Sequence, residues 1–186
     1  MTTLLGRALR PLRADPTRSP LAHKALAATD QIILTSPDFS DGAPLPRSAA
    51  GPGVGANISP ALRWEHIPSA TTQLVLFLDD IDVPLPKPLI HNAAVLSPSA
   101  AGIEAGTLRH GQDGVRMVPT RLAKDGYAGP RPIPGHGPHR YRFHLLASDT
   151  PIPRDITTVR ALLSALAGHV IARGQLTGTY ERPSPS

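Results

Sequence analysis

The frequency and spacing of proline and glycine limit the length of regular secondary structure in this sequence more than any other feature does. The 22 prolines and 16 glycines of the 186-residue chain lie between apolar runs and do not gather in one low-complexity block. Both residues interrupt regular structure and mark turns. The pattern therefore favours short strands joined by ordered loops, and the chain length favours a single domain with a real hydrophobic core.

Five segments have the β-branched or apolar character of strands and are bounded by turn residues. They are residues 31–35, 73–78, 90–96, 115–118 and 140–147. The run LVLFL at 74–78 is apolar throughout. A strand of this kind is covered on both faces, so we expect it at the centre of a sheet.

One helix is expected near the C-terminus. Thr157 or Thr158 can cap its start, and Gly174 is expected to end it. Apolar residues recur between these points at helical spacing: Val159, Leu162, Leu163, Leu166, Val170 and Ile171. This helix should pack one face on the sheet.

The first thirty residues differ from the rest, so we divide the chain into an extension, 1–30, and a domain, 31–186. Leucine and alanine alternate there with Arg7, Arg10 and Arg13, which is the layout of a basic amphipathic segment. Pro11 would kink or end such a helix. A membrane-surface anchor and a frayed or docked extension are both consistent with this pattern, and the short span favours the extension.

Composition excludes several classes of function. The chain has no cysteine, which excludes disulfides and thiolate chemistry and fits a reducing cytoplasm. No apolar run has the length of a membrane span, and the first residues lack the features of a secretory signal, so we expect an unexported protein without stable membrane insertion. The net charge of +5 favours anionic partners, but scattered basic residues and few aromatic residues argue against nucleic acid.

The segment 129–143, GPRPIPGHGPHRYRF, joins a Pro/Gly-rich loop to an alternating strand. Side chains along a strand alternate between two faces. One face should carry His139, Tyr141 and Phe143, and the other Arg140, Arg142 and His144. The first face is interpreted as one wall of a binding pocket.

Together with three other segments, this stretch resembles the phosphatidylethanolamine-binding protein family, specifically its bacterial, Raf-kinase-inhibitor-like branch. The other segments are GANISPALRW at 55–64, DDIDVP at 79–84 with His91 downstream, and GHVIARGQLTGTYER at 168–182. The resemblance covers about residues 33–182. It implies a mainly β fold with a large antiparallel sheet, a smaller sheet packed on it and a C-terminal helix. Bacterial relatives are often dimeric, so it also favours a homodimer.

The resemblance further implies an anion pocket. Residue by residue, its lining would comprise Asp80, His91, Pro132, His139 and Tyr141, with Asp82, Gly129, Pro130 and Arg131 in supporting positions. Ile81, Ile133 and the pair Leu89–Ile90 depart from the family pattern, which predicts a more aliphatic rim.

The residue types fit this chemistry, because imidazoles can donate hydrogen bonds to phosphate oxygens and a carboxylate such as Asp80 can keep one of them protonated. For Asp82 a structural role in a turn is favoured. Two histidines and a carboxylate also suit zinc or iron, but no close-spaced metal signature is present, so we expect neither metal nor cofactor. The remaining loop or surface histidines are expected to be His23, His66, His110, His136 and His144.

The resulting interpretation is a binding protein for a small anion such as a phosphate ester or phospholipid head group. One alternative is a domain that acts through a protein partner, as an inhibitor or modulator of a kinase or another enzyme. A second is a weak hydrolase that uses Asp80, His91 and His139. No nucleophile elbow, P-loop or dinucleotide motif is present, which favours binding over catalysis.

Overall fold

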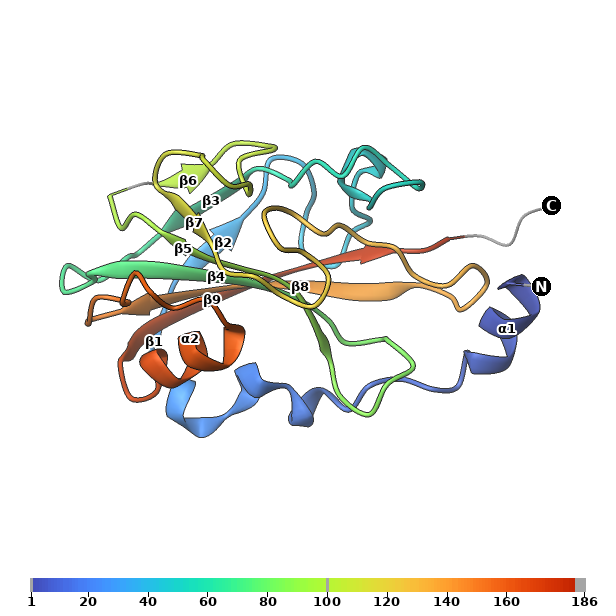
Figure 1. Cartoon of the computed structure of the whole chain (residues 1–186), viewed down its shortest axis with the longest axis horizontal. Coiled ribbons are helices and arrows are strands. Elements are labelled where there is room, and N and C mark those ends of the chain that lie inside the picture. Colours follow the sequence, from blue (N-terminus) through green and yellow to red (C-terminus); the bar gives the residue numbers. More distant parts are fainter. Residues whose placement is uncertain (1, 100, 183–186) are drawn as a thin grey trace.

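The computed structural model describes residues 2–99 and 101–182, which form two packed β-sheets with a helical layer on one side (Figure 1). The large sheet has six strands in the order β1-β9-β8-β4-β5-β7. Their bounds are β1 Asp30–Gln31, β4 Gln73–Asp80, β5 Leu89–Leu96, β7 Val115–Met117, β8 His139–Ser148 and β9 Val170–Tyr180. All neighbours are antiparallel except β1 and β9, which run parallel.

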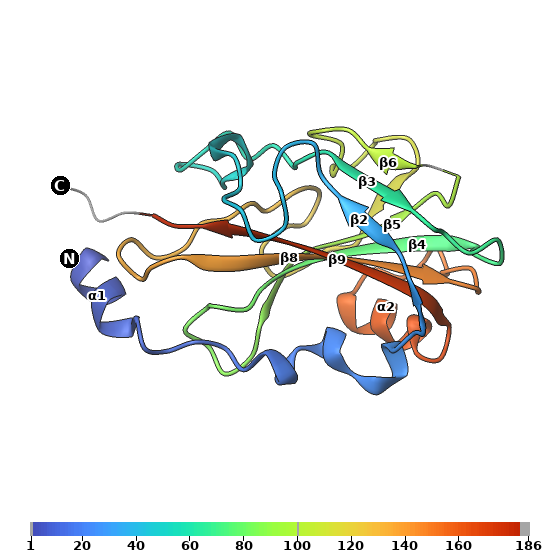
Figure 2. The ribbon, with the colours of Figure 1, turned by 180° about the vertical axis from the view of Figure 1, so that it is seen from behind.

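The small sheet covers one face of the large one. It contains β2 Ile33–Thr35, β3 Leu62–Glu65 and β6 Gly102–Ile103 in the order β2-β3-β6. The opposite face carries helix α2, Val159–Leu166, and the N-terminal segment, as the two opposed views show (Figures 1 and 2). The mainly β fold class expected from the sequence is therefore confirmed.

The continuous apolar run of β4 is explained by this sandwich. Alternate residues Leu74, Leu76 and Leu78 belong to the core cluster beneath the small sheet. Val75 and Phe77 belong to the cluster beneath α2 and the N-terminal segment. Because β4 lies between β5 and β8, neither its edges nor its faces meet solvent, as expected for this segment.

Two expectations, about the end of the C-terminal helix and about the first strand, were wrong. The helix begins after its cap Thr158, as one of the two alternatives had it, but ends at Leu166. Val170 and Ile171 instead begin β9, an eleven-residue strand that pairs with β8 along most of its length. The segment 31–35 is divided between β1 and β2, which belong to different sheets.

The N-terminal residues lie against the domain. Helix α1, Thr2–Leu9, ends before Pro11, and three short 3-10 turns follow: Pro16–Arg18, Pro20–Ala22 and Lys24–Leu26. Leu21 and Leu26 are buried in the cluster beneath α2. The Ser19 hydroxyl, also buried, donates to Asp79 Oδ2 at 3.2 Å.

His144 was expected at the surface, but it is buried on the same face of the sheet as this segment. It lies in β8, and its Nε2 is 3.1 Å from Asp79 Oδ1. Arg142 forms a two-pronged ion pair with the same carboxylate at 2.9 and 2.6 Å. Burial opposes ionisation of Asp79, but hydrogen bonds from His144 and Arg142 outweigh it, so the pKa of this carboxyl is lowered.

Candidate functional site

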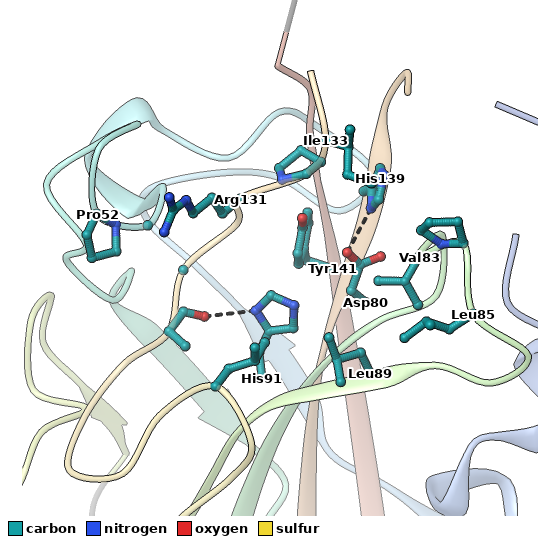
Figure 3. A pocket seen from close by; sticks show the side chains of 16 residues that line it. Pro52, Asp80, Val83, Leu85, Leu89, His91, Arg131, Ile133, His139 and Tyr141 are labelled. Carbon is teal, nitrogen blue, oxygen red and sulfur yellow. Dashed lines mark hydrogen bonds and ion pairs between the residues drawn. The ribbon is translucent and has the colours of Figure 1, made fainter. Parts of the chain in front are cut away.

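A cavity of about 420 Å³ opens where β4, β5 and β8 meet the loop 128–133 (Figure 3). Its wall includes all five residues expected to bind a ligand: Asp80, His91, Pro132, His139 and Tyr141. Much of the remaining wall is aliphatic: Val83, Leu85, Leu89, Leu122 and Ile133. The structure thus assembles polar groups from three strands and a distant loop inside an apolar enclosure.

Asp80 and Tyr141 lie directly opposite each other in the β4–β8 register, and His139 precedes Tyr141 by two residues on the same face. Asp80 and His139 are both buried, and His139 Nδ1 is 2.7 Å from Asp80 Oδ2. The other carboxylate oxygen accepts the backbone N–H of Asp82 at 2.8 Å. Both oxygens of Asp80 therefore already hold hydrogen bonds.

His136 was expected on a loop or at the surface, but it is completely buried behind His139. The Nδ1 atom of His136 lies 2.7 Å from Nε2 of His139, and its own Nε2 lies 2.9 Å from the carbonyl oxygen of Leu9. A guanidinium nitrogen of Arg13 lies 3.1 Å from the same Nδ1. The N-terminal segment thus closes the back of the site, which the sequence did not indicate.

These contacts orient the ring protons. A carbonyl oxygen can only accept, so His136 Nε2 carries a proton and donates it to Leu9. Burial, then Arg13 and His139, lower the pKa of His136, so this ring is neutral and its Nδ1 is an acceptor facing Arg13 and His139. On its other side, His139 is held by the Asp80 carboxylate.

His91 reaches the cavity through a β-bulge. The pairing of β4 with β5 passes from Leu78↔Asn92 to Asp79↔Ile90, which leaves His91 as the extra residue. A bulge changes the direction of a side chain. Ile90 accordingly packs toward the helical layer, whereas His91 lines the cavity on the other face.

Two asparagines hold the loop beside His91. Asn92 donates to the Gly126 carbonyl and accepts from the Ala128 N–H, at 2.9 and 3.2 Å. Asn57, within the GANISP motif, donates to the Tyr127 carbonyl and accepts from the Gly129 N–H. The Ala128 carbonyl is thereby held 3.0 Å from His91 Nδ1. Neither asparagine was singled out from the sequence, although Asn57 lies in a motif that was.

Tyr141 contributes a hydroxyl group without a partner. Its ring packs edge-to-face on His91, with ring centroids 5.4 Å apart. The hydroxyl is buried and has no hydrogen-bond partner of normal geometry within the described part of the chain, although the Asp80 side chain and the Arg131 backbone are near enough to act on its pKa as weak hydrogen-bond contacts. Burial, followed by Asp80, raises that pKa strongly, so Tyr141 remains a neutral phenol.

The four supporting residues have different positions. Gly129 and Arg131 line the cavity, and Arg131 is exposed at its rim. The structure places Pro130 and Asp82 outside its lining: the Pro130 carbonyl accepts the Gly51 N–H, and Asp82 forms an ion pair with Arg140 at 2.8 Å. The role of Asp82 in a turn stays a prediction.

The sequence and fold match those of known proteins. Residues 35–181 match the family model described as phosphatidylethanolamine-binding protein. The chain therefore belongs to the phosphatidylethanolamine-binding protein family, as its motifs suggested.

Bacterial members are among its relatives. A UPF0098 protein of Chlamydia muridarum is 34% identical over 158 residues, covering 80% of this chain and 98% of the relative. A solved structure from Chlamydia trachomatis, described as a homologue of phosphatidylethanolamine-binding protein, has 32% identity and a TM-score of 0.73 over 83% of this chain and 99% of its own. YbcL from E. coli has 25% identity and a TM-score of 0.74, with 81% and 98% covered.

A further relative differs in its name. LppC of Mycobacterium tuberculosis, provisionally named a lipoprotein, is 34% identical and matches 83% of this chain and 74% of its own length. Among residues 2–99 and 101–182, none of the helices has the length and apolar character needed to cross a bilayer. The same residues include no group of three or more histidine, cysteine or acidic side chains arranged to hold a metal ion.

Proposed function

We propose that the protein binds a small anion of the phosphate-ester class in the cavity between β4, β5, β8 and the loop 128–133. The observation that carries this proposal is the buried Tyr141 hydroxyl, which lines the cavity without a hydrogen-bond partner among the described residues. A buried polar group without a partner costs free energy unless a ligand or water satisfies it. An oxygen-rich ligand would accept from this hydroxyl.

The surroundings favour an anionic head on a small organic group. Arg131 at the rim and the net positive charge of the chain attract anions. The aliphatic side chains Leu85, Leu89 and Ile133 can pack against the carbon part of an ester. Both oxygens of Asp80 are already engaged, one with His139 Nδ1 and the other with the Asp82 N–H, which reduces the repulsion between this carboxyl group and an anionic ligand.

The test is a titration with inorganic phosphate and phosphoethanolamine, followed by the NMR signals of the histidine rings. Saturable shifts are expected in the wild-type protein and a large loss of affinity in Tyr141→Phe. Tyr127→Phe is the matched control, because the Tyr127 hydroxyl is also buried and unpartnered among the described residues but does not line the cavity. Equal affinities in the two variants would remove the basis of the proposal.

We also propose a cytoplasmic location, which the absence of cysteine supports. The lipoprotein name of LppC belongs to that relative. Cell fractionation with an antibody against this chain tests the proposal, and recovery in the membrane fraction would refute it.

A further inference from the structure

A second property of the cavity concerns the protons of its ligand, and it rests on the proposed anion site. Most polar atoms of the site are already occupied. His139 uses one ring nitrogen for Asp80 and the other for His136, and Asp80 uses both oxygens within the protein. These groups cannot donate to a ligand without breaking buried hydrogen bonds. Direct recognition inside the cavity therefore falls to His91 and Tyr141, with Arg131 at the rim.

His91 presents an acceptor, because the Ala128 carbonyl lacks a proton and the 3.0 Å contact therefore requires the ring proton on Nδ1. In the neutral imidazole the other nitrogen, Nε2, then carries a lone pair, and it has no partner among the described residues. Figure 3 shows the ring directed into the cavity, toward Asp80 and Tyr141. The Asn92 contacts that hold Ala128 also hold this tautomer in place.

The charged groups around His91 do not reverse this state. Asp80 faces it from β4, His139 and Tyr141 from β8, and Arg131 from the loop, while Asp79 acts on it from the opposite face of the sheet. Burial dominates these influences and lowers the pKa of His91, so the neutral ring prevails near neutral pH.

A fully ionised phosphate fits this arrangement poorly. It would place an oxygen lone pair against the lone pair of His91 Nε2. A phosphate that keeps one proton instead donates its P–O–H to Nε2 and accepts from the Tyr141 hydroxyl with another oxygen. The protonated ligand thus satisfies both free groups at once.

We propose that the cavity selects phosphate monoesters that carry one proton over phosphodiesters, with His91 Nε2 as the residue that determines this specificity. A diester has no P–O–H group, so its binding requires that His91 itself be protonated, and burial of the ring opposes that protonation. Monoesters supply the proton themselves, because their second ionisation has a pKa of about 6.

The test compares methyl phosphate with dimethyl phosphate, which differ by one methyl group, by isothermal titration calorimetry. We expect dimethyl phosphate to bind at least about tenfold more weakly than the singly protonated form of methyl phosphate, once the affinity is corrected for the fraction of monoester that keeps its proton at the pH of the titration; this is the effect of one missing hydrogen bond to a charged group. Affinity for methyl phosphate should fall about ninefold between about pH 7 and about pH 8, as its protonated fraction falls. Titrations in two buffers of different ionisation enthalpy should show uptake of about one proton per complex in that range.

His91→Gln gives a second readout. The amide supplies a permanent N–H donor, so the pH dependence should flatten and the preference for the monoester should narrow. His169→Gln is the control, because His169 is an exposed histidine at the opposite end of the sheet and its loss should leave the profile unchanged. If His91→Gln does not fold, the comparison of the two esters and the proton uptake by the wild-type protein decide together.

The outcomes separate the two proposals. Equal affinity for both esters without proton uptake would overturn the proton requirement and leave the anion site intact. Absence of saturable binding by either ester, at every pH tested, would overturn the proposed function and this inference with it.

Discussion

Replacing Tyr141 with phenylalanine should make the protein more stable while weakening ligand binding. The substitution removes one oxygen atom that is buried and unpartnered among the described residues, and it leaves the packed ring in place. Leaving a buried polar group unsatisfied costs about 1–3 kcal/mol, so its removal should raise the free energy of unfolding by up to that amount. For a chain of this length, each kcal/mol raises Tm by roughly 2–4 °C.

Thermal and urea denaturation without ligand measure the change, and Tyr127→Phe provides the comparison. Its hydroxyl is equally buried and unpartnered in the described structure, so a similar gain in stability is expected. Only Tyr141→Phe should also lose affinity for phosphate, since Tyr127 does not line the cavity. A loss of stability in Tyr141→Phe would show that the hydroxyl contributes a favourable interaction in the ligand-free protein, and the reasoning would fail.

Two further predictions concern packing and pH. In Gly129→Ala the new Cβ would lie 2.0 Å from the Ala49 carbonyl oxygen, so the loop must shift, at a cost of about 1–3 kcal/mol in urea denaturation and with weaker phosphate binding. Gly126→Ala meets no atom closer than 3.7 Å and should leave both unchanged, so equal effects of the two substitutions would contradict this steric argument. Lowering the pH should reduce the free energy of unfolding in two stages. The first begins below about pH 6.5, because burial lowers the pKa of His144 and this residue takes up a proton on unfolding. The second begins below about pH 4, because the pKa of Asp79 is also lowered and its carboxylate then takes up a proton on unfolding. Both groups bind protons more tightly in the unfolded chain, so a stability profile that stays flat from about pH 7 to about pH 3 would contradict the assignment.

Much of the fold was predictable because the strands carry local signals. The apolar run of β4 and the alternation of β8 follow from the period of two along a strand, and Thr158 has the side chain of a helix cap. Strand β9 was missed because its first residues continue the apolar spacing of α2, so periodicity alone did not reveal the change of structure. Its pairing with β8 settles that ambiguity through long-range hydrogen bonds.

The candidate site was predictable in part. Motif resemblance led to the five residues that the structure brings to one cavity, and their role in binding remains a prediction. His136 was misjudged because a histidine in a Gly/Pro-rich loop has the local features of an exposed residue. Its burial depends on Leu9 and Arg13, which lie more than a hundred residues away in the sequence.

The class of fold, the central strand and the residue types of the site can be predicted from the amino-acid sequence, because they follow from side-chain periodicity and from motifs that are local in the chain. Which atoms of those residues remain free depends on how distant segments pack together. A one-residue bulge turns His91 into the cavity, and the docked N-terminal segment occupies His136 and, through it, His139. Strand register and long-range docking set these hydrogen bonds, and neither is encoded in the spacing of any single segment.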